Sequence, residues 1–158
     1  MKLNFFERLF IRSPVRPLIQ RHLEARKLLD LGGTQNGGHV LEIGCGPGGG
    51  IELIDDLFKV ASVHAFDLDF RMIGEARRRR RNGRQVTKAI FWTGNARQIP
   101  VADNTYDAVF NFGAIHHIVD WRAALEEVRR VFQAGGRFYR EENPKYYITH
   151  LFWGRLRD

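Results

Sequence analysis

The stretch from Val40 to Gly50 combines one acidic side chain with a run of glycines. Glu42 lies in an apolar run, and five of the seven residues from 44 to 50 are glycine. Glycine lets the backbone turn sharply and lets a ligand come close to it. Gly44, Gly46 and Gly49 also satisfy G-x-G-x-x-G, which usually receives a pyrophosphate. An acid two residues before the first glycine opposes that use, because it places negative charge near the phosphates. The pattern therefore favours a ligand that carries a positive charge.

A second carboxylate follows the next apolar run. Asp67 lies 18 residues past Gly49 in the sequence FDLD. Asp69 directly precedes a helical pattern and is predicted to be a helix cap. Asp107 falls early in a later strand, away from the end where ligands bind, so we expect it to be structural.

Polar side chains also follow a later apolar run, at Asn111, His116 and His117. Imidazole titrates near neutral pH, so a histidine here is a candidate general base. A packing role is the alternative, and His116 is the better candidate to face a substrate. Cys45 is the one cysteine, and we interpret it as a small residue that fills the turn rather than as a nucleophile.

Strand and helix patterns alternate along the chain, and this places the polar residues above on strand ends. Such alternation predicts a parallel sheet with helices on both faces. In sheets of this kind ligands bind at the carboxyl ends of the strands. The expected strands are 39–44, 60–68, 86–94, 105–113 and 137–143, and the expected helices are 50–58, 70–83, 121–136 and 145–158, with a loop or short helix near 98–104.

From Val40 to about Glu142 the sequence resembles the class I S-adenosylmethionine (SAM)-dependent methyltransferases, of the type 11 or quinone-methyltransferase kind. The first family motif is an acid, one residue, then G-x-G-x-G, and Glu42 with the glycines at 44, 46 and 48 matches it in full. Tyr106–Asp107 matches the aromatic–Asp pair that opens strand four. Ala134 stands where the family usually has proline before strand five.

The resemblance implies SAM as the cofactor and no metal. Glycine backbone would meet the aminocarboxypropyl end, Asp67 the ribose hydroxyls, and Leu68 the adenine. Asn95 stands where the family usually has an acid for the adenine amine, and an amide oxygen can also accept that hydrogen bond. The implied cofactor contacts are Glu42, Gly44, Cys45, Gly46, Gly48, Asp67, Leu68, Met72, Asn95, Ala96 and Asn111.

The fold class that the resemblance implies is α/β, a Rossmann-like, doubly wound, mostly parallel sheet in three layers. We expect an N-terminal helical segment over 1–35, as a lid or as packing helices, and a SAM-binding domain over 36–158. The family sheet has seven strands. Only 16 residues follow Glu142, so the last two strands are expected to be missing. An uncovered strand edge would invite pairing, and a homodimer is left open.

The charge of the chain suggests an anionic partner, such as a nucleic acid, an anionic membrane surface or an acidic substrate, and does not choose among them. The chain has 158 residues, 25 basic and 18 acidic, and a net charge of +7. The five arginines from 77 to 81 point around a helix rather than to one face, which favours a solvated helix end over contact with an anion or a nucleic acid. A single cysteine fits the cytoplasm. The amphipathic N-terminal helix leaves peripheral membrane contact open.

The predicted activity is methyl transfer from SAM to a small, apolar acceptor such as a quinone precursor or a lipid. His116 is the candidate catalytic residue. Two alternatives are kept: a SAM-binding module with little or no activity, and a nicotinamide-dependent oxidoreductase, which Glu42 opposes.

Overall fold

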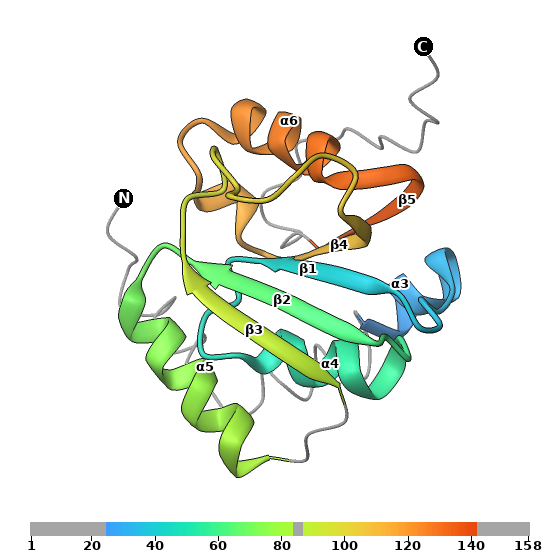
Figure 1. Cartoon of the computed structure of the whole chain (residues 1–158), viewed down its shortest axis with the longest axis vertical. Helices are drawn as coiled ribbons and strands as arrows, with labels where there is room; N and C mark the ends of the chain where they lie inside the picture. The colour runs from blue at the N-terminus through green and yellow to red at the C-terminus, as the bar shows by residue number, and fades with distance from the viewer. Residues whose placement is uncertain (1–24, 84–86, 142–158) are drawn as a thin grey trace.

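A computed structural model describes residues 25–83 and 87–141 of the chain. It contains one sheet of five parallel strands in the order β3-β2-β1-β4-β5 (Figure 1). The strands are β1 His39–Ile43, β2 Ser62–Asp67, β3 Lys88–Thr93, β4 Tyr106–Phe112 and β5 Phe132–Glu141. From β1 to β3 each new strand adds to one side of the sheet, and β4 then adds to the other side of β1. The carboxyl ends of β1 and β4 are therefore neighbours at the switch point, where such sheets bind ligands.

Helices lie on both faces of the sheet, as the alternating pattern predicts (Figure 1). They are α3 Ala25–Gly32, α4 Gly49–Leu57, α5 Phe70–Asn82 and α6 Trp121–Val131, with the 3₁₀ turn η2 Ile115–His117. The Asp69 carboxylate accepts a hydrogen bond from the Arg71 amide, 2.9 Å away, so its predicted role as a helix cap is confirmed. The three-layer, doubly wound α/β fold is likewise confirmed.

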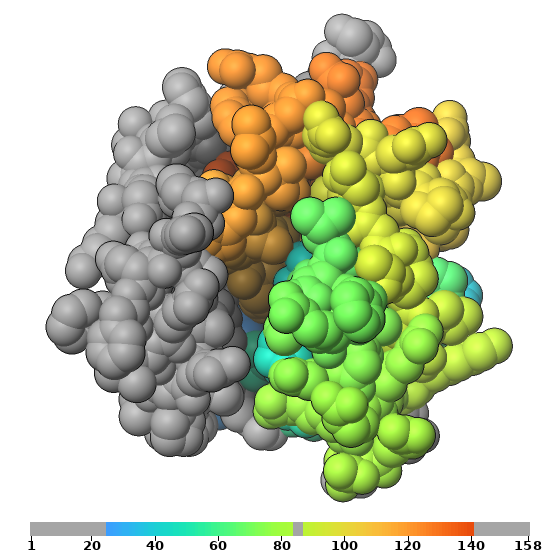
Figure 2. Space-filling model, turned by 90° about the vertical axis from the view of Figure 1, so that its left-hand side faces the viewer, coloured from blue at the N-terminus to red at the C-terminus, as the bar shows by residue number. Residues whose placement is uncertain are grey.

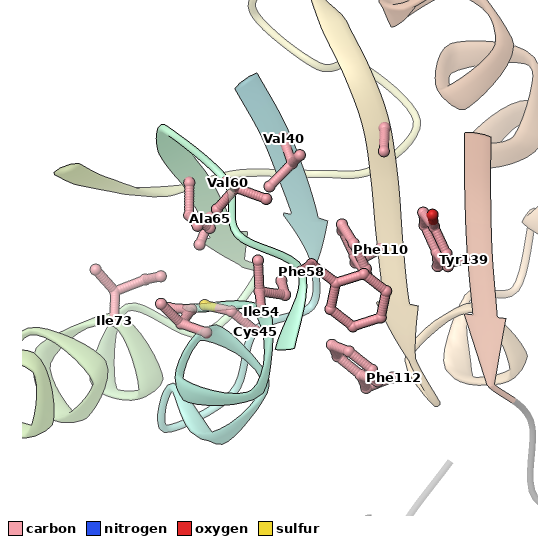
Figure 3. Close-up of a cluster of buried hydrophobic side chains, with 13 residues drawn as sticks. Val40, Cys45, Ile54, Phe58, Val60, Ala65, Ile73, Phe110, Phe112 and Tyr139 are labelled. Atoms are coloured by element: carbon pink, nitrogen blue, oxygen red, sulfur yellow. The ribbon is translucent and has the colours of Figure 1, made fainter. Parts of the chain in front are cut away.

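The two faces of β1 belong to two hydrophobic cores. Val40 packs with α4, α5 and the aromatic side chains of β4 and β5, among them Phe110 and Tyr139 (Figure 3). Leu41 and Ile43 face the other core, beneath α6 and the β3–β4 connection. Because side chains alternate along a strand, Glu42 projects to the Val40 face, toward α4.

The predicted helix over 121–136 is too long. α6 ends at Val131, and β5 begins at the next residue. The reason lies in another part of the chain: the amides of Asn104 and Thr105 donate to the carbonyls of Arg130 and Val131, at 2.9 and 2.8 Å. The β3–β4 connection thus takes the carbonyls at the end of the helix. That connection itself forms no helix; Asn95 and Gln98 pair in an isolated bridge.

The arginine run of α5 is less solvated than predicted. Arg79 forms a two-pronged ion pair with Glu52 of α4, at 2.8 Å. Arg80 binds Asp55 and Thr87, and the side chains of Arg80 and Asp55 are only 10% and 3% exposed. These pairs fasten α5 to α4, so the run has a structural use that its sequence does not display.

Several predictions fall outside the described residues: the N-terminal helix before residue 25, and the helix over 145–158. The lid and the membrane contact therefore remain predictions. The homodimer and the division at residue 35 also remain predictions, because nothing in the described residues tests them. Among the described helices, none combines the length and apolar character that crossing a bilayer requires.

Candidate cofactor-binding site

The glycine turn joins β1 to α4 in a conformation that its sequence requires. Gly44, Gly46 and Gly48 have φ angles of 64°, 51° and 89°, a region that other residues rarely occupy. A Cβ atom on Gly44 would lie 2.3 Å from the Ala114 Cβ, so this glycine also lets the turn after β4 approach. Cβ atoms on Gly46 and Gly49 would have no neighbour within 4 Å. The turn is therefore closed toward the protein and open on its outer side.

The outer side of the turn lies in a recess. Viewed onto this side of the molecule, the green chain around the start of α5 and the orange chain after β4 flank a narrow hollow in which the cyan segment shows (Figure 2). A broader hollow of 720 Å³ lies along the β3–β4 connection and α6. Of the predicted site residues only Asn95 borders that hollow, so we place the site at the turn.

Glu42 lies beneath the turn, where burial makes its ionised form unfavourable. The residue is 2% exposed, and Oε2 has no hydrogen-bond partner among the described residues. Oε1 lies so close to Gly50 that a Cβ there would be 2.0 Å away. Burial, and after it the negative charge of Asp67, raises the pKa of Glu42 well above its ordinary value. A buried carboxyl oxygen without a partner fits a ligand that brings a donor or a positive charge.

Asp67 stands at the end of β2 and shapes the turn directly. Its Oδ2 accepts a hydrogen bond from the Gly46 amide, and its Oδ1 accepts one from the Asp69 amide, both at 2.9 Å. A carboxylate has about four acceptor positions, so two remain for a diol. The sequence reasoning missed the bond to Gly46, because it joins residues 21 apart.

The side chains predicted to surround adenine lie at the same edge of the sheet. Leu68 is 74% exposed, which is unusual for leucine and leaves it available to a ligand. Met72 is half-buried on the first turn of α5. Asp67 pairs with Thr93 across β2 and β3, which places Asn95 and the buried Ala96 just beyond the neighbouring strand end. The Asn95 Oδ1 accepts a bond from the Arg97 amide at 3.0 Å, and it keeps a second acceptor position.

Asn111 is fully buried near the end of β4. Its Oδ1 accepts hydrogen bonds from the amides of Ala114 and Ile115, at 2.9 and 3.1 Å. These bonds fold the chain back toward the glycine turn. His116 follows on η2, half-buried, with its ring 3.9 Å from that of His117. Both imidazoles thus lie past the carboxyl end of β4, where the sequence predicted them.

Cys45 turns its side chain into the core and only its backbone toward the site (Figure 3). The residue is 4% exposed, and its amide donates to the Phe66 carbonyl at 3.0 Å. Burial raises the pKa of the Cys45 thiol, which opposes nucleophilic reactivity. This agrees with the interpretation of Cys45 as a turn residue. Asp107, also predicted to be structural, accepts the His39 amide at 2.7 Å.

The sequence of the chain matches that of a known protein family. The family model described as "Methyltransferase domain" matches residues 41–140. The chain belongs to this family. The resemblance to class I SAM-dependent methyltransferases is thereby confirmed.

Among curated relatives, a fatty-acid O-methyltransferase of Mycolicibacterium smegmatis is 35% identical over 75% of this chain and 42% of its own length. A phthiotriol/phenolphthiotriol dimycocerosates methyltransferase of Mycobacterium tuberculosis is 34% identical over 87% of this chain and 48% of its own. The chain thus spans less than half the length of these two relatives. It spans 89% of the putative methyltransferase YrhH of Bacillus subtilis, at 30% identity over 96% of this chain.

Solved structures agree with the fold. The PH0226 protein of Pyrococcus horikoshii superposes with a TM-score of 0.69 at 27% identity, over 87% of this chain and 65% of that protein. The YcgJ protein of Bacillus subtilis gives a TM-score of 0.68 at 26% identity, over 74% of this chain and 49% of that protein.

Proposed function

We propose that this methyltransferase domain binds SAM and transfers its methyl group to a small, apolar acceptor. The observation that carries the proposal is the buried Glu42 carboxyl, whose Oε2 has no partner within the described residues, beneath a glycine turn that is open outward. SAM has an ammonium, a sulfonium and no phosphate. A dinucleotide would instead bring phosphates toward this acid, which argues against the nicotinamide alternative.

The residues present fit each of the three parts of the cofactor: the aminocarboxypropyl end, the ribose and the adenine. Glu42 and the glycine backbone would hold the aminocarboxypropyl end. Asp67 would accept from the ribose hydroxyls with the acceptor positions that its two amide bonds leave. The adenine would lie by Leu68, with Met72, Asn95 and Ala96 completing its surroundings. Asn111 would act at the other end of the cofactor, because its side chain folds the segment after β4 toward the glycine turn.

Methyl transfer from a sulfonium is an in-line displacement for which the bound cofactor supplies the electrophile. The chain's own task is to position both reactants and to exclude water. A positioning role for residues after β4 is supported by the bonds of Asn111, which fold that segment back to the glycine turn. His116 would contact the acceptor and, where the acceptor is a hydroxyl, take up its proton.

The apolar acceptor class rests on relatives and on exposed side chains. Relatives at 30–35% identity include the fatty-acid and phthiotriol methyltransferases and a ubiquinone/menaquinone C-methyltransferase of Paracoccus denitrificans. Phe70 and Val119, which follow β2 and β4, are 72% and 101% exposed. Exposed apolar side chains in the segments that follow these strands suit an acceptor of low polarity.

Calorimetric titration with S-adenosylhomocysteine (SAH), and with NADH as a control, tests the cofactor. We expect SAH to bind and NADH not to bind. Asp67→Ala should weaken SAH at least about tenfold, which corresponds to about 1.4 kcal/mol. Asp67→Asn is the matched variant, because an amide oxygen can still accept the Gly46 amide while the charge is lost.

A folded protein that binds NADH and ignores SAH would refute the proposal. A protein that binds SAH but turns over neither a fatty acid nor a quinone precursor would be the binding module considered above.

A further inference from the structure

Arg130 of α6 uses every donor of its guanidinium within the fold. Nε and Nη2 donate to the two carboxylate oxygens of Glu127, at 2.7 and 2.8 Å. The remaining donors reach the β3–β4 connection: Nη2 binds the Ile99 carbonyl, and Nη1 binds the Val101 carbonyl and the Asp103 carboxylate, each at 2.8 Å. A guanidinium has five N–H groups, and these five bonds take them all.

Glu127, the partner of Arg130 on α6, also binds the backbone of the β3–β4 connection. Its Oε2 accepts a hydrogen bond from the Ile99 amide at 2.7 Å. Ile99 is therefore held at both its amide and its carbonyl by one pair of side chains from α6. The hydrogen bonds from Arg130 lower the pKa of Glu127, so the pair stays charged and its bonds are of the stronger, charge-assisted kind.

A short hydrogen-bonded turn connects Ile99 to the residues that follow β3. The amide of Gln98 donates to the Asn95 carbonyl, and the amide of Arg97 donates to the Asn95 Oδ1, both at 3.0 Å. The four residues 95–98 thus form one tight turn, followed at once by Ile99. The place at which Ile99 is held therefore constrains where Asn95 and Ala96 lie.

We propose that Arg130, together with Glu127, is a positioning residue that sets Asn95 and Ala96 against the adenine end of the cofactor. This inference rests on the proposed function, because it needs adenine at that edge. All five donors of Arg130 are engaged within the fold, so none is left for a reactant. It acts through the backbone of a connection that contains no helix of its own and depends on α6 for its register.

Lysine cannot replace arginine in this role. An ammonium is a compact point charge, and it cannot reach two carbonyls and two carboxylates with the planar fork that these five bonds use. Arg130→Lys keeps the charge and loses the geometry, which makes it the informative variant. Glu127→Gln is a milder second variant, since one oxygen remains to accept the Ile99 amide. Asp103→Asn is the control: it alters an exposed partner of the same guanidinium and no backbone bond.

The test compares SAH with S-inosylhomocysteine, which carries an oxygen in place of the adenine amine. Wild type should prefer SAH. We expect Arg130→Lys to weaken SAH about tenfold, since small displacements of positioning groups cost this much or more. The preference for SAH over the inosyl compound should fall toward one. Glu127→Gln should change both quantities in the same direction by less, and Asp103→Asn should leave both as in wild type.

The result separates positioning from general weakening. Equal losses for both ligands, with the preference kept, would overturn the inference, as would an SAH affinity within about twofold of wild type. If Arg130→Lys does not fold, Glu127→Gln decides by the same criterion. Failure of wild type to bind SAH would instead refute the proposed function itself.

Discussion

Replacing Glu42 by glutamine should stabilise the empty protein and weaken its cofactor. The two side chains have nearly the same shape, so the variant tests charge rather than packing. Glu42 is 2% exposed, and the structure gives its Oε2 no partner within the described residues. An amide avoids the cost of burying a carboxylate. The same change removes the negative charge that would face the cofactor's ammonium.

The sign of the stability effect follows from the pKa. Burial, and then the charge of Asp67, raises the folded-state pKa of Glu42 above the value in the unfolded chain. Between those two values the folded protein holds the proton more tightly, so this group's contribution falls as pH rises, by about 1.4 kcal/mol per pH unit. Glutamine does not titrate, so Glu42→Gln removes this pH-dependent loss of stability. The variant's advantage should grow with pH through this window.

The affinity effect has the opposite sign. A hydrogen bond to a charged group contributes about 1.5–3 kcal/mol, so SAH should bind at least about tenfold more weakly to Glu42→Gln. In wild type a bound ammonium would favour the ionised carboxyl. Binding should therefore release protons, and the affinity should increase as pH rises toward the raised pKa.

Urea unfolding and calorimetry in two buffers of different ionisation enthalpy measure these quantities. Glu126→Gln is the control, because Glu126 lies on α6 with an exposed side chain away from the glycine turn. The reasoning is refuted if Glu42→Gln binds SAH as wild type does, or if it unfolds more easily at neutral pH.

Three further predictions concern the scaffold. Gly44→Ala should abolish SAH binding and destabilise the fold, because its φ is positive and its Cβ would lie 2.3 Å from another side chain; Gly49→Ala, where the Cβ meets nothing, should fold normally by circular dichroism. Arg80→Ala should lower the free energy of unfolding by about 3 kcal/mol, because it leaves the buried Asp55 carboxylate without its positively charged partner. Arg78 is exposed, and Arg78→Ala should change the free energy of unfolding by under about 0.5 kcal/mol. Cys45 should resist alkylation by iodoacetamide until urea unfolds the protein; rapid labelling of the native state would contradict its burial.

Local patterns predicted most of the fold because local chemistry determines it. The glycines after β1, the Asp69 cap and the alternating apolar runs each fix an element over a few residues. The end of α6 was not predictable in this way. It is set by amides of Asn104 and Thr105, which lie more than twenty residues before the carbonyls that they bind.

The same distinction applies to the candidate site. The acid, the glycines and Asp67 have characteristic spacing, so their placement could be predicted from sequence. The partners of Arg80 and Arg130 could not, because a surface arginine and a fully bonded one look alike in sequence. Their roles depend on which backbone carbonyls and carboxylates the fold brings to them.

The strand order has a consequence for synthesis on the ribosome. β1, β2 and β3 emerge consecutively and pair into one half of the sheet. The other edge of β1 must wait for β4, whose first residue follows the last of β1 by more than sixty positions. During that interval an apolar strand with unpaired amides and carbonyls is exposed, and such edges favour aggregation. Pauses in translation after β1 has emerged and before β4 has emerged should therefore lower the yield of folded protein more than pauses before β1 has emerged.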